Sequence, residues 1–311
     1  MANSATLWPE LNWQSWHDTA ETLHMMTQIV GKTRLALEPL KNHWWNVPLY
    51  VSARGLTTSA MPLPDGELLD IEFDFLSSRL VFRASRGQVE SMPLEPKPVA
   101  DFFAEYKKAL AGIGAAVEIW PMPVEVQNPI RFDQDTVHKS YDADAARRFW
   151  QVLMQASALF RRFSTNFYGK ISPVHFFWGS FDLALTRFNG PKAPPRPGAG
   201  RVENEAYSHV CISAGFWPGN GGYGKAAFYT YAAPVPSGLA ERTLRGLGGF
   251  NKALGEFILD YDDVRRAPVP GQAVLDFLNE AYDAAADSCG WDRAALDRHD
   301  PACEAAFKVE A

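Results

Sequence analysis

One succession of elements occurs twice along the chain and limits the fold more than any other feature. In each half, a segment with a helical period precedes a histidine that is followed by two aromatic residues, and alternating runs typical of strands come next. The two motifs are His43-Trp44-Trp45 and His175-Phe176-Phe177. The helical patterns cover residues 15–30, 98–110, 142–165 and 272–286, and the strand patterns cover residues 47–53, 68–75, 80–84, 89–94, 117–119, 181–188, 207–215, 226–232 and 256–261.

This repeated order predicts an α+β fold made of two similar halves that are related by a pseudo-two-fold repeat. Residues 1–125 and 126–311 would each form a four-stranded, largely antiparallel sheet backed by helices, and together they would form one globular unit. The second half is longer because of three inserts rich in glycine or proline, at residues 192–200, 215–224 and 234–249, and because of a polar C-terminal tail. We expect the histidine-aromatic motif to be a strand in both halves.

Charge and hydrophobic patterning exclude two classes of partner. The formal net charge is −6, and no run of lysine or arginine provides the basic surface that nucleic-acid binding requires. No stretch approaches the roughly 18 apolar residues of a membrane span, and the first residues lack the pattern of a signal peptide. Cys211, Cys289 and Cys303 lack the spacing of metal ligands. We therefore expect a cytoplasmic protein without disulfides, either a monomer or a homodimer.

Three histidines are the candidate catalytic residues. His43 and His175 hold matching positions in the repeat, which would bring them to one seam, and His209 lies on a later strand. Imidazole titrates near neutral pH and therefore suits acid–base chemistry. The same residues could instead bind a metal ion, or hydrogen-bond a carbonyl within a packed core. Because the sequence contains no closely spaced histidine motif, we assign no metal ligands and leave the cofactor open.

Alternation along the strands places further side chains on one face of the second sheet. If residues 181, 183 and 185 face the helices, Asp182 faces the other way, together with His209 and Cys211 of the next strand. Asp182 would orient an imidazole or pair with an arginine. Small, hydroxyl-bearing and ionisable residues among aromatic ones suit a small-molecule cavity, whereas a solvated face would carry more lysine and glutamate. The candidate substrate-binding residues are Arg54, Arg187, Tyr50, Trp178, Trp217 and Tyr229.

Several long stretches point to a family. Residues 42–58 read NHWWNVPLYVSARGLTT, and residues 173–188 read PVHFFWGSFDLALTRF. Together with shorter stretches at residues 8–11, 28–37 and 213–219, they resemble an uncharacterised bacterial family of the domain-of-unknown-function type, DUF5996, over nearly the whole chain. The resemblance implies a bacterial source and one globular unit, and it provides no catalytic residue to transfer.

These features lead to a functional hypothesis. We expect an enzyme that acts on a small aromatic or amphipathic metabolite in a cavity between the halves. His43, His175 and His209 would be its acid–base groups, and Asp182 would orient one of them. The alternative is a non-catalytic protein that binds or senses a small molecule in the same aromatic cavity.

Overall fold

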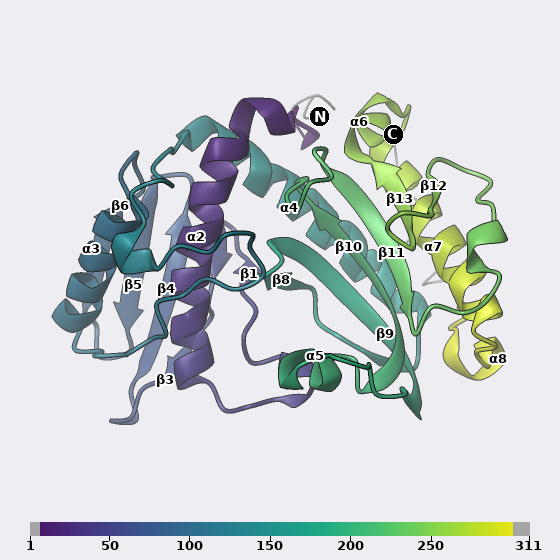
Figure 1. Cartoon of the computed structure of the whole chain (residues 1–311), viewed down its shortest axis with the longest axis horizontal. Helices are drawn as coiled ribbons and strands as arrows, with labels where there is room; N and C mark the ends of the chain where they lie inside the picture. The colour runs from purple at the N-terminus through teal and green to yellow at the C-terminus, as the bar shows by residue number, and fades with distance from the viewer. Residues whose placement is uncertain (1–6, 301–311) are drawn as a thin grey trace.

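The long helix α2 (Trp13–Leu37) lies in front of the strands of the first half (Figure 1). In the computed structural model, which describes residues 7–300, this helix continues beyond its predicted end at residue 30. Gly31 does not end the helix because it lies beneath the Trp178 ring, where a β-carbon would come within 2.1 Å of Cδ1. The helix is buried without interruption from Thr22 to Arg34, since it packs against helix α3 (Val99–Gly112), strand β3 (Met61–Pro62) and helix α4 (Ala143–Phe163).

The first half forms a six-stranded antiparallel sheet in the order β1-β2-β4-β5-β6, with β3 paired to β4. Helix α3 (Val99–Gly112) follows Pro98 and packs its apolar face against β6 and α2. The predicted strand at residues 117–119 is wrong, because these residues pair with no strand in the structure. The strands are β1 (Tyr50–Val51), β2 (Gly55–Thr57), β3 (Met61–Pro62), β4 (Leu68–Asp74), β5 (Arg79–Ala84) and β6 (Val89–Pro93).

The second half forms a seven-stranded antiparallel sheet in the order β12-β13-β11-β10-β9-β7, with β8 also paired to β9. Helices α4 (Ala143–Phe163) and α7 (Pro270–Ser288) pack against each other and against this sheet, and Figure 1 shows α4 behind the strands and α7 to their right. The strands are β7 (Lys170–Ile171), β8 (His175–Phe177), β9 (Asp182–Lys192), β10 (His209–Trp217), β11 (Ala227–Ala233), β12 (Gly249–Asn251) and β13 (Glu256–Asp260). The short helices are α5 (Arg201–Ala206), α6 (Tyr261–Arg266) and α8 (Arg293–Leu296), with 3-10 turns η2 (Phe132–Gln134), η3 (Ser164–Asn166) and η4 (Leu239–Glu241).

The predicted α+β class with two antiparallel sheets is confirmed, although the sheets have six and seven strands rather than four each. The additional strands are two or three residues long, which is too short for alternation to reveal. None of the helices within residues 7–300 combines the length and apolar character needed to span a bilayer. Part of the predicted C-terminal tail, residues 301–311, lies outside the described residues.

A short antiparallel bridge joins the two halves. The backbone amides of Leu49 and Phe176 each donate a hydrogen bond to the other residue's carbonyl, both at 2.9 Å. Next to this bridge, the Trp178 indole donates to the Val47 carbonyl at 2.9 Å. One continuous cluster of buried apolar residues extends through both sheets. The seam between the halves is therefore a packed junction, and both histidine motifs lie beside it.

Candidate functional site

His43 lies in a tight turn and not in the strand that we predicted. Asn42–Trp44 form a 3-10 turn, η1, in which His43 and Trp44 have left-handed backbone angles, with φ of 57° and 59°. Successive left-handed residues cannot continue an extended strand, and for a residue with a β-carbon this conformation costs roughly 1–2 kcal/mol. The turn brings the His43 ring to the end of α5, where Nδ1 lies 2.9 Å from the Ala206 carbonyl oxygen.

The contact with Ala206 fixes the tautomer of the neutral His43 ring. Because a carbonyl oxygen only accepts, Nδ1 carries the hydrogen and Nε2 keeps its lone pair. That lone pair accepts a hydrogen bond from Lys170, with Nζ and Nε2 2.7 Å apart. Lys170 lies in β7 directly opposite Phe188 of β9. Its amine is 5.0 Å from the centroid of the Phe188 ring and 5.1 Å from that of Trp45, so the pair has aromatic surroundings.

Both basic groups of this pair are harder to protonate than they would be in water. Burial lowers the pKa of His43, the hydrogen bond to the Ala206 carbonyl opposes that shift, and the nearby Lys170 and His209 lower the pKa further. Burial also lowers the pKa of Lys170. Within residues 7–300, no carboxylate forms an ion pair with Lys170. An anion is therefore the species that would complement the pair and favour its protonation.

His209, the first residue of β10, joins this group. Its ring stands edge-on to His43 with the centroids 5.7 Å apart, and its Nδ1 is 3.1 Å from the Ser208 hydroxyl oxygen. The register of β10 against β9 shifts between His209 and Cys211. Such a bulge changes the direction of a side chain at the end of a strand. The structure thus brings together two of the three predicted catalytic histidines.

His175 lies in β8, as predicted, but it is enclosed. Its side chain is only 1% exposed, and Nε2 has no hydrogen-bond partner among the described residues. Burial and, to a smaller extent, the charge of Arg34 lower the pKa of His175 to about 3, so the ring is neutral at physiological pH. Its ring contacts three aromatic rings at centroid distances of 5.4–5.7 Å, those of Trp45, Tyr50 and Phe177.

His43 and His175 both contact the Trp45 ring beside the seam. The centroid of the Trp45 ring lies 5.2 Å from that of His43 and 5.7 Å from that of His175. His43 therefore belongs to the basic group with Lys170, whereas His175 belongs to the packed seam. Tyr50 lies between that seam and α2, with the Arg34 guanidinium 5.3 Å from the centroid of its ring.

Asp182, the first residue of β9, accepts hydrogen bonds from the hydroxyl groups of Ser180 and Tyr229. Burial raises the pKa of its carboxyl group, whereas the two hydroxyl contacts oppose that shift. No hydrogen bond joins Asp182 to a histidine within the described part of the chain. Arg54, a predicted substrate-binding residue, donates to Asp74 at 2.7 Å within the first sheet.

A row of aromatic side chains connects Asp182 with the histidine group. The rings of Tyr229 and Tyr231 are stacked with centroids 5.9 Å apart, and the hydroxyl oxygens of Tyr231 and Tyr207 lie 2.7 Å apart. Trp217 contacts the Tyr229 ring at 5.2 Å. Beyond them, one cluster contains Phe188, Cys211, Ala233, Trp45, Tyr207 and Tyr231. The predicted face of the second sheet therefore carries acidic, aromatic and basic side chains in succession.

Like Arg54, the predicted substrate-binding residues Arg187 and Trp178 are engaged away from this face. Arg187 is completely buried on the helix-covered side, where Nη2 donates to the Phe163 carbonyl and, at 2.6 Å, to Asn166 Oδ1. Its guanidinium lies 3.6 Å from the centroid of the Phe163 ring and 4.3 Å from that of Tyr282. Trp178 is held at the seam by the Val47 carbonyl and covers Gly31. Lys170, Trp45 and Phe188 surround His43, but we did not predict them as site residues.

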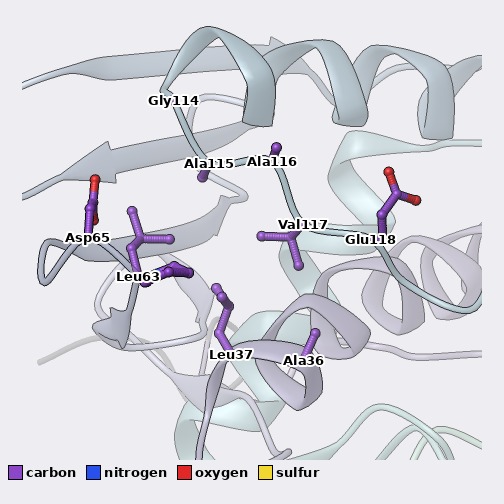
Figure 2. A pocket seen from close by; sticks show the side chains of 10 residues that line it. Ala36, Leu37, Leu63, Asp65, Gly114, Ala115, Ala116, Val117 and Glu118 are labelled. Atoms are coloured by element: carbon purple, nitrogen blue, oxygen red, sulfur yellow. The ribbon is translucent and has the colours of Figure 1, made fainter.

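Two cavities lie apart from these residues. One, of about 390 Å³, is lined by residues of α2, of the β3–β4 turn and of the segment 114–118 (Figure 2). The other, of about 540 Å³, is lined by residues 10–12 and 14–16 and by Arg148. Neither is lined by a predicted site residue. Within residues 7–300, no group of three or more histidine, cysteine, aspartate or glutamate side chains is arranged to hold a metal ion.

The fold and this site define an α+β protein with two antiparallel sheets and a basic aromatic cluster beside their junction. A family model described as a family of unknown function (DUF5996) matches residues 8–298. The chain therefore belongs to this family, as its sequence motifs predicted. No curated protein and no solved structure matches it.

Proposed function

We propose that the protein is an enzyme acting on a small amphipathic metabolite, with an aromatic or apolar body and an anionic group, beside the seam. Lys170 and His43 would receive the anionic group, and Trp45 and Phe188 would contact the apolar body. The observation that carries this proposal is the 2.7 Å contact between Lys170 Nζ and His43 Nε2 in aromatic surroundings, without a carboxylate partner for Lys170 among the described residues.

The electrostatics of the pair favour an anionic ligand. Two basic groups in contact repel each other when both are protonated, which contributes to the lowered pKa of His43. An anion placed against them would reverse that repulsion and raise both pKa values, so binding should take up protons near neutral pH. Hydrogen bonds to charged groups contribute about 1.5–3 kcal/mol, which makes Lys170 the principal anchor.

His43 is the residue best placed for acid–base chemistry. The Ala206 carbonyl fixes the hydrogen on Nδ1, so Nε2 carries a lone pair that points toward the exposed Lys170 amine. When Lys170 turns to a ligand anion, that lone pair becomes free to accept a proton from the ligand. His209, edge-on to His43, is the second candidate for this proton transfer.

A second candidate function is non-catalytic binding of the same class of molecule. The enclosure of His175 and the engagement of Asp182 by Ser180 and Tyr229 favour it, because neither residue contacts His43. Under this alternative, the basic pair and the aromatic rings recognise the ligand, and no proton transfer follows.

The test compares charged and neutral forms of one ligand body. Phenylacetate, phenyl phosphate and indole-3-acetate are titrated into the wild type by calorimetry in two buffers, with phenylacetamide as the neutral form. We expect the anions to bind with proton uptake, and Lys170→Met to weaken them about ten- to hundredfold, which is roughly 1.4–3 kcal/mol. Lys107→Met, which removes an exposed lysine beside the Phe103 ring, is the matched control. Equal binding of phenylacetamide, or unchanged affinity in Lys170→Met, would refute the proposed site.

A second measurement separates the enzyme from the binding protein. An anion that binds is incubated with protein in D₂O and followed by proton NMR. Deuterium incorporation or a new product with the wild type, absent with His43→Gln, indicates an enzyme. A ligand that binds and stays unchanged indicates the non-catalytic alternative.

A further inference from the structure

The cavity of about 540 Å³ lies where helix α2 begins beside helix α4. It is lined by the residues just before α2, by residues 14–16 in the first turn of that helix, and by Arg148 of α4. At this place the Trp16 ring packs against that of Phe149, with the centroids 5.1 Å apart. Cavities that hold small molecules have volumes of roughly 300–1,000 Å³. This one is therefore large enough for a small molecule.

Arg148 places an unpaired cation in the wall of this cavity. Its side chain is half-buried, and it forms no hydrogen bond or ion pair within residues 7–300. The neighbouring Arg147, by contrast, donates to the Leu76 carbonyl at 3.3 Å. A planar guanidinium can donate two parallel hydrogen bonds to one carboxylate. The free guanidinium of Arg148 is therefore suited to a carboxylate that enters the cavity.

The beginning of α2 adds further donors beside Arg148. The residue before the helix, Asn12, forms no capping hydrogen bond with its side chain, and the first turn carries no acidic residue. The backbone amides of Trp13 and Gln14 donate to no acceptor in the part of the chain that the structure describes. Free amides at the positive end of a helix dipole favour an anionic group.

A buried donor in the same wall also indicates a ligand, independently of the helix end. Trp16 lines the cavity, and its residue is only 3% exposed. Its Nε1 hydrogen nevertheless has no acceptor within residues 7–300. A buried indole N–H normally has a hydrogen-bond partner, because leaving the donor unpaired costs free energy. An oxygen atom of a bound molecule would supply the acceptor that Trp16 lacks.

Glu10 contributes the opposite charge to this cavity. Its side chain is exposed, and it forms no ion pair among the described residues, not even with Arg148. An anion alone would be repelled by the Glu10 carboxylate. A ligand that carries both charges complements the two unpaired groups better. Leu11, which is 5% exposed, and the Trp16 ring give the same wall an apolar part.

We propose that this cavity binds the zwitterionic form of an α-amino acid with an apolar side chain. The carboxylate faces Arg148, the Trp16 indole N–H and the free amides at the beginning of α2. The ammonium group faces Glu10, and the side chain contacts the apolar part of the wall. Binding involves no covalent step, and it is independent of the function that we propose for the seam.

The first test compares molecules that share one apolar body. L-leucine, L-methionine, 4-methylpentanoate and 3-methylbutylamine are titrated into the full chain by calorimetry at pH 7.5. The last two are leucine without its amino group and leucine without its carboxylate. We expect an amino acid to bind with a Kd below about 1 mM, and each leucine analogue to bind at least about tenfold more weakly than leucine. Failure of both amino acids to bind, or equal binding of 4-methylpentanoate, would overturn the proposal.

Variants of the carboxylate-binding side identify the residues responsible. Arg148→Met should weaken leucine binding about ten- to hundredfold. Arg161→Met, which removes an exposed arginine from the last turn of the same helix, is the matched control. Trp16→Phe keeps an aromatic ring but removes the N–H donor, and it should weaken binding about three- to tenfold. Circular dichroism checks that each variant is folded. Unchanged affinity in a folded Arg148→Met protein would overturn the proposed site.

Two further variants test the ammonium side and the separation from the seam. Glu10→Gln should weaken leucine binding about three- to tenfold without weakening the binding of 4-methylpentanoate, because only leucine carries an ammonium group. Equal losses for both molecules would overturn the role of Glu10. Lys170→Met should leave the affinity for leucine unchanged. A loss of leucine binding in Lys170→Met would place the amino acid at the seam and overturn the proposal for this cavity.

Discussion

Replacing His175 with phenylalanine tests the electrostatics of the seam through the pH dependence of stability. In the native protein the pKa of His175 is lowered to about 3, first by burial and then by the charge of Arg34. In the unfolded chain the same group takes up a proton near pH 6.5. Folding therefore lowers this pKa, and the unfolded state binds the proton first as the pH falls. The native state loses stability progressively between about pH 6.5 and about pH 3.

The size of the effect follows from linkage. Each pH unit in that window contributes about 1.4 kcal/mol per histidine, so the wild type should lose roughly 2 kcal/mol through His175 between pH 7.5 and pH 5. His175→Phe removes this loss. At pH 7.5 the variant should be neutral or more stable, because it removes a buried nitrogen without a hydrogen-bond partner among the described residues.

The assay is urea unfolding followed by tryptophan fluorescence at both pH values. The difference in unfolding free energy between His175→Phe and the wild type should grow by roughly 2 kcal/mol in favour of the variant at pH 5. Other titrating groups are present in both proteins and cancel in this difference. Tyr50→Phe is the control, since it alters a ring in contact with His175. Burial raises the pKa of Tyr50, so its hydroxyl group does not titrate between pH 5 and pH 7.5. A constant difference between variant and wild type would refute the enclosed, neutral histidine.

Two further substitutions and one alkylation reaction test the packing of buried residues. Gly31→Ala should destabilise the protein by roughly 1–3 kcal/mol in chemical denaturation, although alanine favours helices, because its β-carbon would lie within 2.1 Å of Trp178 Cδ1. Arg187→Lys should lower the Tm by about 2–4 °C for each kcal/mol of stability lost, because a lysine cannot reproduce the planar guanidinium that stacks on Phe163 and donates two hydrogen bonds from Nη2. An unchanged melting curve would contradict this prediction. Burial raises the pKa of Cys211 to about 12, so iodoacetamide at pH 8 should alkylate it at least about tenfold more slowly than the half-buried Cys289, as measured by peptide mapping.

Long periodic segments of this fold are predictable because each residue adds to the pattern. The apolar stripe of α4 and the alternation of β4, β9 and β10 specify elements of at least seven residues. Strands of two residues, such as β3 and β7, carry no such pattern and form only when a longer strand offers a partner. The predicted end of α2 at Gly31 fails for a related reason, because a glycine beneath a tryptophan and a glycine after a helix look alike in sequence.

The candidate site also contains some features that the sequence pattern indicates and others that it does not. We predicted Arg187 as a substrate-binding residue, although alternation puts it on the same side of β9 as Leu183 and Leu185, where the structure buries it against α4. The left-handed turn at His43 does not follow from the sequence, because nothing in its neighbours requires a positive φ. The contact of Lys170 with His43 also cannot be predicted from the sequence, since only the pairing of β7 with β9 brings the lysine amine to the His43 ring.

Arg34, near the C-terminal end of α2, connects this helix to the segment that follows the His43 turn. Arg34 donates from Nε to the Asn46 carbonyl at 3.0 Å, and it donates to the Thr58 carbonyl, which anchors the segment after the His43 turn. Arg34→Lys should therefore loosen that segment and weaken anion binding at Lys170, as measured by the same calorimetric titration. Unchanged affinity in this variant would show that the segment does not position the Lys170 site.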